Sequence, residues 1–375
     1  MTQAFDICIR GSGIVGSTLA LLLARERLRV GLVVATPASN QPASGAPSDV
    51  RAYALNAKSR ALLKSLRCWP GAMHTTKVLR MQVKGDAGGE VNFSAAELQV
   101  PSLAWIVDAP TLEAQLVQAL GFQPLIELLD APAPAALTVI CEGKASQTRA
   151  EFGIDFELTN YSQSAIAARL QCQVPHGQTA RQWFSQGEIL AFLPLDGPQG
   201  SSVAVVWSVQ KDRVQKLLDL SPAEFCQQLG AASEHSLGEL GLIGERKVWP
   251  LQAARAGHWA GTHAGKAWVL AGDAAHSVHP LAGQGLNLGL SDAAELANIL
   301  HERDFWRNVD DEKLLRRYER SRKAEVLAMA ATINGLQRLF SQQGGLWQTA
   351  RNWGMNGFEH SGLIKQWVAR QAMGF

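Results

Sequence analysis

The chain has 375 residues, of which 47% are hydrophobic and 18% charged, and its formal net charge is +2. At about 150 residues per domain, this length predicts two or three structural units, and the composition excludes a disordered or fibrous protein. A net charge near zero provides no long-range attraction for nucleic acid or for an anionic membrane, so we expect no nucleic-acid partner.

The five cysteines are scattered and form no C-x-x-C pair, so the sequence predicts neither a disulfide framework nor a zinc site. The N-terminus lacks the basic start and apolar core of a secretory signal. The longest apolar run, residues 14–24, is shorter than the roughly 18 residues that a membrane-spanning helix needs. We therefore expect a cytoplasmic protein that is at most peripheral to the inner face of the membrane.

The chain begins with the order strand, glycine-rich turn, helix, strand. Residues 5–10 are apolar and precede G-S-G-I-V-G, residues 17–27 have helical spacing, and residues 29–35 form a second apolar run. This order is typical of the βαβ unit that opens a dinucleotide-binding domain. In such a unit the glycines allow a tight turn, a close approach of the pyrophosphate, and packing of the helix on the strand; here they are Gly11, Gly13 and Gly16.

The second strand lacks the acidic residue that usually ends it and binds the ribose hydroxyls. Val34 occupies that position, and Thr36 follows shortly after. A hydroxyl cannot accept two ribose hydrogen bonds as a carboxylate does. The sequence therefore predicts a weakened site for the adenosine end of a nucleotide.

Farther along the chain, the hydrophobic pattern changes twice. Residues 78–93 and 162–209 contain alternating runs that predict one antiparallel sheet. From Trp268 the chain returns to a buried strand and then a long helix through Leu300. The nucleotide-binding unit is therefore predicted to be discontinuous, and residues 312–375 are predicted to be mostly helical.

The most specific segment is A-G-D-A-A-H-S-V-H-P-L-A-G-Q-G-L-N-L-G-L-S-D, residues 271–292. Asp273 follows a buried strand directly, Pro280 bounds a turn, and G-Q-G-L-N opens a helix. This arrangement supplies a carboxylate for sugar hydroxyls and backbone donors for an anionic ring oxygen.

With this segment the sequence resembles the FAD-dependent aromatic hydroxylases of the para-hydroxybenzoate hydroxylase class, and within them the ubiquinone-biosynthesis hydroxylases. The resemblance covers nearly the whole chain, including D-V-R-A-Y-A-L-N at residues 49–56. It implies that Asp273 contacts the flavin ribityl chain and that Arg51 lies near the flavin. The remaining implied flavin contacts in the 271–292 segment are Gly272, Pro280, Gly283, Gly285, Leu286 and Asn287.

Two more features depart from that family. Its second nucleotide motif reads C-E-G-K-A-S-Q-T-R here, so that Glu142 replaces an Asp before Gly143, with Ser146 and Arg149 following. The segment between residues 120 and 142 is too short for the family's three-stranded β-meander. We expect a pruned flavin domain, with part of its sheet uncovered or covered by a partner.

The expected fold class is α/β, with three parts. A discontinuous Rossmann-type FAD-binding domain comprises residues 1–75, 101–160 and 262–340. An antiparallel β-sheet substrate domain comprises residues 76–100 and 161–261, and a helical segment comprises residues 341–375.

The reaction that the resemblance implies is hydroxylation of an aromatic ring by FAD with NAD(P)H and O₂, on a polyprenyl phenol of ubiquinone biosynthesis. No general base is identified; Arg51, Pro280, Leu286 and Asn287 are the flavin-proximal candidates. The full set expected to bind the cofactor is Gly11, Gly13, Gly16, Val34, Arg51, Glu142, Gly143, Gly272, Asp273, Pro280, Gly283, Gly285, Leu286 and Asn287.

Two other functions stay open at this point. Val34, Glu142 and the missing meander favour a flavin-poor accessory subunit of a biosynthetic complex, whereas a flavin hydroxylase for another small aromatic would fit the same motifs. Residues 362–375 form an amphipathic pattern that would meet a membrane or prenyl tail, or dock on the protein's own core. The sequence also leaves open whether the chain forms a homo-oligomer.

Other conspicuous residues have structural interpretations. His276 and His279 form H-x-x-H without a further ligand nearby, so we expect no metal site. Trp207, Trp249 and Trp268 fall in apolar runs and are predicted to be core residues. The basic run at residues 316–323 is predicted to be a solvated helix face.

Overall fold

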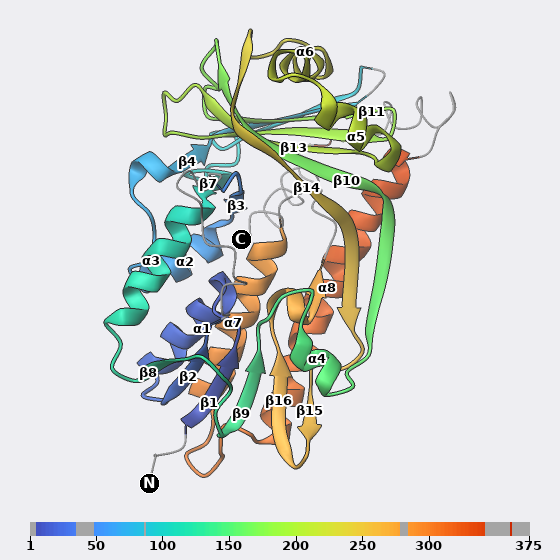
Figure 1. Ribbon diagram of the computed structural model, residues 1–375. Coiled ribbons are helices and arrows are strands. Elements are labelled where there is room, and N and C mark those ends of the chain that lie inside the picture. Colours follow the sequence, from blue (N-terminus) through green and yellow to red (C-terminus); the bar gives the residue numbers. More distant parts are fainter. Residues whose placement is uncertain (1–4, 35–48, 86–87, 278–283, 342–360, 362–375) are drawn as a thin grey trace.

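The computed structural model describes residues 5–34, 49–85, 88–277, 284–341 and 361, and its two main sheets lie at opposite ends of the molecule (Figure 1). The lower sheet has six strands in the order β15-β16-β9-β1-β2-β8, and all pair in parallel except the β15–β16 hairpin. Its strands are β1 (Phe5–Arg10), β2 (Val30–Val33), β8 (Ile126–Leu129), β9 (Ala135–Ile140), β15 (Ala260–His263) and β16 (Lys266–Leu270).

Helices pack against the parallel sheet and against one another. α1 (Ile14–Arg25) contacts both α3 (Ala109–Gly121) and α7 (Gly285–His301), and α7 contacts α8 (Glu312–Ser341). Strand residues under these helices, such as Ile7, Leu32 and Val139, are fully buried. Such short, continuous apolar strands are typical of a parallel sheet, because crossover helices cover it.

The upper sheet has eight strands in the order β17-β14-β10-β13-β12-β11-β5-β6. Its strands are β5 (Arg80–Lys84), β6 (Glu90–Ser94), β10 (Phe156–Cys172), β11 (Thr179–Ser185), β12 (Glu188–Pro194), β13 (Ser202–Gln210), β14 (Leu240–Ala256) and β17 (His276–Ser277). The helices α5 (Lys211–Asp219) and α6 (Pro222–Ala232) pack on it, and Phe225 of α6 joins Ile166 and Trp207 in one core cluster. One face of this sheet is therefore filled with large side chains.

A third, small sheet with its helix lies between the two large ones (Figure 1). It has the order β3-β7-β4, with β3 (Ala52–Leu55), β4 (Thr75–Val78) and β7 (Ala104–Asp108), and α2 (Ala57–Ser65) follows β3. The remaining elements are α4 (Gln147–Glu151) and the 3₁₀ turns η1 (Ala72–His74) and η2 (Gly272–Ala274). β10 and β14 run from the upper sheet down beside the lower one (Figure 1).

The predicted α/β class is confirmed, with one correction to the upper sheet. β5 and β11 pair in parallel, because β5 comes from a distant segment and joins the sheet by a crossover. Residues 121–142 contain only β8 and β9, both parallel members of the lower sheet, so this span forms no antiparallel meander. The predicted domain boundaries stay a prediction, and residues 342–375, apart from Ser361, lie outside the described residues.

The basic run at residues 316–323 is only partly a solvated face. Arg316 and Arg317 are exposed, but Tyr318 and Arg322 are buried. The prediction is wrong for those two because their partners, the Leu270 carbonyl and Asp292, come from distant parts of the chain. Among the described residues, no helix has the length and apolarity to cross a membrane.

Candidate active site

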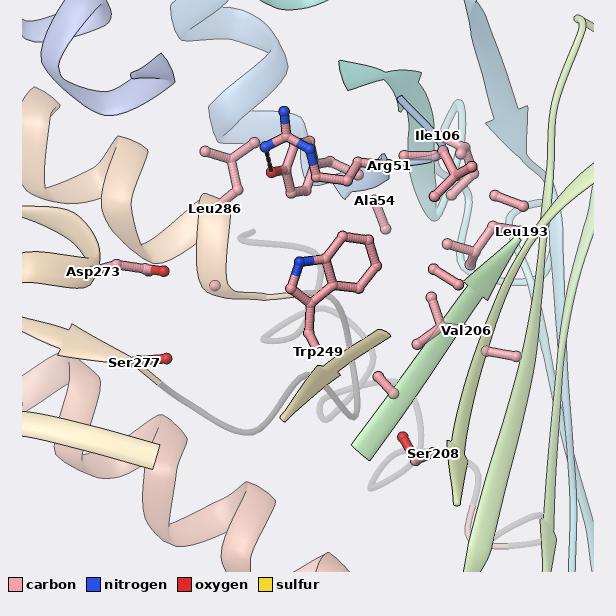
Figure 2. Close-up of a pocket in the computed structure, with 18 of the residues that line it drawn as sticks. Arg51, Ala54, Ile106, Leu193, Val206, Ser208, Trp249, Asp273, Ser277 and Leu286 are labelled. Carbon is pink, nitrogen blue, oxygen red and sulfur yellow. Dashed lines mark hydrogen bonds between the residues drawn. The ribbon is translucent and has the colours of Figure 1, made fainter. Parts of the chain in front are cut away.

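A cavity of about 590 Å³ lies between the upper sheet and the ends of the lower strands (Figure 2). Gly13, Gly143, Asp273 and Leu286 line it on the side of the parallel sheet. On the other side, the lining comes from the upper sheet and from β3 and β7. One cavity therefore joins the predicted nucleotide-binding segments to the predicted substrate sheet.

The glycine-rich turn has no room for a Cβ atom at two of its glycines and has room for one at the third. A Cβ at Gly16 would lie 1.9 Å from the Gly11 carbonyl oxygen, and one at Gly11, whose φ is +108°, would lie 2.5 Å from the Cys141 carbonyl oxygen. Gly13 is the N-cap of α1; among the described residues, no atom lies within 4 Å of a Cβ built there and no side chain caps the helix. The free N–H groups of this helix end therefore face the cavity, which fits a dinucleotide phosphate.

At the end of β2, the residues that the structure describes offer no side-chain acceptor. The N–H of Val34 donates to the Leu129 carbonyl at 2.9 Å, and its half-buried side chain is apolar. Val34 therefore lies where the sequence predicted and lacks the carboxylate that would bind ribose hydroxyls. Thr36 lies outside the described residues.

Glu142 does not line the cavity, because its carboxylate bonds within its own turn. It accepts hydrogen bonds from the Ser146 hydroxyl at 2.6 Å and from the Thr148 hydroxyl and N–H at 2.6 and 3.0 Å. Its neighbours Gly143 and Lys144 do line the cavity. Lys144 was not among the predicted site residues, although a cation beside the Glu-Gly pair was a signal for an anionic ligand.

Arg149 connects this turn to the Gly-Asp segment. It donates to the Ala274 carbonyl at 3.0 Å and to the Lys144 carbonyl at 2.5 Å, and only 6% of its surface is exposed. The two motifs that the sequence separates by about 130 residues are therefore held together by one buried guanidinium.

Asp273 points its carboxyl group into the cavity (Figure 2). It lies in η2, directly after Gly272. The turn requires a φ of +63° at Gly272, which glycine adopts readily. Burial among protein atoms raises the pKa of this carboxyl group, while the charges of Lys144 and His276 act in the opposite direction. The cavity still gives it access to solvent, so Asp273 is free to accept hydrogen bonds from a bound sugar alcohol.

A buried cluster holds the Asp273 turn in place. Asp292 accepts hydrogen bonds from the Gly272 N–H at 2.8 Å, from His276 at 2.7 Å and from Arg322 at 2.7 Å. Burial alone would raise the pKa of Asp292, but His276 and Arg322 outweigh it and hold this pKa below its usual value. His276 thus serves this cluster, where it also stacks on Trp259, and His279 lies outside the described residues.

The start of α7 contributes one cavity residue and one structural residue. Leu286 lines the cavity (Figure 2), as does Gly285. The Asn287 amide is 3% exposed; it donates to the Ala54 carbonyl at 2.8 Å and accepts from the Asn56 N–H and the Ser59 hydroxyl. Asn287 therefore ties α7 to the β3–α2 junction rather than facing the cavity. Pro280 and Gly283 lie outside the described residues.

Arg51 forms part of the cavity wall, fixed by two carboxylates. It pairs with Asp49 and with Glu113, and it donates to the Tyr53 hydroxyl at 3.3 Å (Figure 2). Its hydrogen bonds to the Asp49 carboxylate raise the pKa of Arg51 above its usual value, so this guanidinium stays charged. Asp49 was not predicted as a site residue, although it stands two residues before Arg51.

The upper sheet presents small apolar side chains to the cavity. Five alanines from four adjacent strands line it, and we call this surface the alanine trough: Ala165, Ala167, Ala180, Ala191 and Ala204. Their neighbours along the strands, such as Ile166 and Leu190, are buried in the core on the opposite face. Strand alternation therefore separates a bulky core face from a shallow face that leaves room for an apolar ligand.

Trp249 corrects the prediction that three tryptophans are core residues. Trp207 and Trp268 are 3% and 6% exposed, but Trp249 is 40% exposed and lines the cavity. The apolar run around it predicted a buried strand, and alternation on β14 instead directs this side chain to the open face.

Comparison with known proteins agrees with this geometry. Residues 133–332 match the family model described as FAD binding domain. The chain is 30% identical to a ubiquinone hydroxylase of Rhodospirillum rubrum, over 98% of this chain and 89% of the relative. It is 29% identical to the 3-demethoxyubiquinol 3-hydroxylase of Escherichia coli, over 99% of both chains.

Solved structures show the same fold. The p-nitrophenol 4-monooxygenase of Pseudomonas putida superposes with a TM-score of 0.75 at 16% identity, over 100% of this chain and 99% of the other. The FAD complex of HpxO from Klebsiella pneumoniae gives a TM-score of 0.71 at 15% identity, over 98% of each chain. These structures show the fold; the family model and the relative from Rhodospirillum rubrum show that the chain belongs to the family of FAD-dependent aromatic hydroxylases that includes the ubiquinone-biosynthesis hydroxylases.

Proposed function

We propose that this chain hydroxylates the aromatic ring of a phenol or quinol that carries a long apolar side chain, in ubiquinone biosynthesis. The observation that carries this proposal is the single cavity in which the FAD-binding motifs face the alanine trough. The names of the relatives from Escherichia coli and Rhodospirillum rubrum support the same substrate class.

The residues present fit FAD at its phosphates and ribityl chain. The N-terminus of α1 would bind the pyrophosphate, because Gly11 and Gly16 bring the backbone close and Gly13 leaves it uncovered. Asp273 would accept hydrogen bonds from the ribityl hydroxyls. When bound, FAD supplies the chemistry that activates O₂ for ring hydroxylation, with NAD(P)H as the source of electrons.

The protein's own contribution is to hold the ring beside the cofactor and to keep water out. The apolar lining from β10, β12 and β13 excludes water from the reacting ring. Each methylene of a side chain that enters the trough would add about 0.8 kcal/mol to binding. The affinity for a long apolar tail would therefore increase with the apolar area that the tail buries in the trough.

We propose further that the protein works at the cytoplasmic face of a membrane, because a substrate with such a tail partitions into the bilayer. Peripheral membrane contact, a biosynthetic complex or a homo-oligomer would each bring the cavity to that substrate. Flotation of the protein with vesicles that contain the substrate would test the first of these.

The reaction itself is tested with purified protein, FAD, NADH or NADPH, isotopically labelled O₂ and 2-decyl-6-methoxyphenol. The expected product carries one labelled oxygen on the ring, and 2-methoxyphenol without the decyl chain should react far more slowly. If the protein binds FAD and oxidises NAD(P)H but labels no phenol or quinol that carries a tail, this substrate class is wrong. If it binds no FAD, the accessory role is the better account.

A further inference from the structure

Trp249 stands in the middle of the cavity and divides it. In Figure 2 the indole lies between Leu286 and Asp273 on one side and Leu193 and Val206 on the other. The first side carries the cofactor motifs, and the second is the wall of the alanine trough. Any ligand that extends from one side to the other has to pass this side chain.

The register of the upper sheet explains why the indole remains uncovered. Ala165 on β10 pairs with Trp249 on β14 and with Ser208 on β13, so these three side chains form one row across the sheet. Adjacent strands lie about 4.8 Å apart, which places Trp249 and Ser208 roughly 10 Å from each other. Only the methyl group of Ala165 lies between them, so no large side chain in this row packs against the indole.

An uncovered tryptophan inside a cavity is unusual for a folded chain. Its exposed fraction of 40% leaves apolar surface in contact with water, at a cost of about 25 cal/mol per Å². Exposed apolar surface of this kind marks ligand-binding sites. The indole therefore has the properties of a ligand contact rather than of a core residue.

The indole also has a polar edge. Among the described residues, no hydrogen-bond acceptor pairs with its Nε1–H. In Figure 2 the indole nitrogen faces the side of Leu286 and Asp273, whereas the six-membered ring faces Ala54 and the sheet. Such a tryptophan suits a ligand whose polar part lies beside the indole N–H and whose apolar part lies beside the six-membered ring.

We propose that Trp249 lies at the junction between the ring and the tail of the substrate and is a specificity-determining residue. Its Nε1–H donates to an oxygen substituent of the ring, and its six-membered ring packs against the first carbons of the apolar tail. This inference rests on the proposed function, because it assumes a substrate with both parts.

The test is a binding measurement on the FAD-loaded protein without NAD(P)H, so that no turnover enters. Calorimetry gives the dissociation constants of two probes, 2-methoxyphenol and 2-decyl-6-methoxyphenol. They are measured for the unmodified chain, Trp249→Phe, Trp249→Ala and the control Trp306→Ala, whose side chain is 65% exposed on another part of the surface. FAD content and melting temperature establish that each variant is folded.

Trp249→Phe keeps an aromatic ring but loses the donor. Both probes should bind about fivefold more weakly, the usual effect of one lost hydrogen bond, and the ratio between the two probes should stay the same. Trp249→Ala also loses the apolar contact, so the advantage of the decyl probe should fall about tenfold further. Trp306→Ala should bind both probes like the unmodified chain.

Unchanged affinities in Trp249→Ala, with both probes bound by the unmodified chain, would overturn this inference and leave the proposed function intact. The decyl probe's advantage is the ratio of the two dissociation constants. If this advantage falls equally in Trp249→Phe and Trp249→Ala, the assignment of the tail to the six-membered ring is contradicted. If the unmodified, FAD-loaded chain binds neither probe, the proposed function fails first.

Discussion

The two sides of the cavity are built by different means. On the cofactor side, backbone geometry fixes the turn at Gly11 and Gly16, and buried hydrogen bonds fix the cluster around Asp292. On the substrate side, the wall is a regular sheet on which the alanine trough lies among larger apolar side chains such as Leu193 and Val206. The first side is suited to one ligand of fixed shape, and the second to apolar ligands of variable length.

This difference predicts which amino-acid substitutions each side of the cavity should tolerate. A substitution at Gly11 or Gly16, or in the cluster around Asp292, meets backbone or a buried charge, neither of which can move away. A substitution in the alanine trough meets open space, so the protein should keep its fold while the ligand preference changes. The following changes separate the two sides.

The largest effect is expected for Gly16→Ala. Its new Cβ would lie 1.9 Å from the Gly11 carbonyl oxygen, and both atoms belong to tightly packed backbone. We expect loss of FAD binding together with a large fall in melting temperature, measured by flavin fluorescence and by thermal unfolding. Gly121→Ala is the matched control, because a Cβ there meets no atom within 4 Å. If a Gly16→Ala protein still binds FAD like the unmodified chain, the turn has room for a Cβ atom and this explanation is wrong.

Arg322→Ala should come next, because it leaves the carboxylate of Asp292 buried with one partner fewer. Removal of one member of a buried ion pair usually lowers the free energy of unfolding by about 3–5 kcal/mol. Urea unfolding at neutral pH measures this loss. Arg316→Ala, on the exposed side of the same helix, should change it by less than about 1 kcal/mol.

The same cluster predicts a pH dependence. The pKa of Asp292 is lower in the folded protein than its ordinary value of about 3.9, so its contribution to stability is complete above about pH 4. That contribution is lost as the pH falls from there toward the folded pKa. Urea unfolding across this range should show a steeper loss for the unmodified chain than for Arg322→Ala; parallel curves would contradict the role of the ion pair.

Ala167→Leu should act on the substrate side alone. The added carbons would fill part of the alanine trough and displace about three methylenes of a bound tail, which corresponds to roughly a 50-fold loss in affinity for a decyl-substituted phenol. FAD affinity and the melting temperature should stay nearly unchanged. Equal weakening of FAD and of the phenol would show that the two sides are coupled.

Val34→Glu is the smallest expected change and a gain. A carboxylate at the end of β2 would accept hydrogen bonds from the adenosine ribose, and two such bonds should tighten FAD binding about tenfold. FMN, which lacks the adenosine half, is the matched control ligand and should bind as before. If FAD affinity does not rise, another group already holds the ribose.

The turns on the cofactor side can be recognised in the sequence because their motifs are local. The strand at residues 5–10 coincides with β1, the glycines need no distant partner to be recognised, and Asp273 lies in the cavity as expected. Asn287 was predicted from the G-Q-G-L-N motif to contact the cofactor. Its amide instead forms hydrogen bonds with Ala54, Asn56 and Ser59. Which neighbour a polar group finds depends on tertiary packing.

The substrate side was less predictable because strand register decides it. Alternation identified β10 to β13, but it could not indicate which face would be covered by helices and which would stay open. Trp249 was therefore predicted to be buried, and the parallel pairing of β5 with β11 was missed. The burial of Arg322 was also not predicted, because its partner Asp292 lies 30 residues away in the chain.

The most direct test of the account is the visible absorption spectrum of the purified protein, recorded with added FAD and then with NAD(P)H in the absence of O₂. We predict about one flavin per chain, bleaching of its absorption on addition of NAD(P)H, and loss of the bound flavin in Asp273→Ala. A protein that stays colourless at high FAD, or an Asp273→Ala variant that stays equally yellow, would contradict the cofactor site described here.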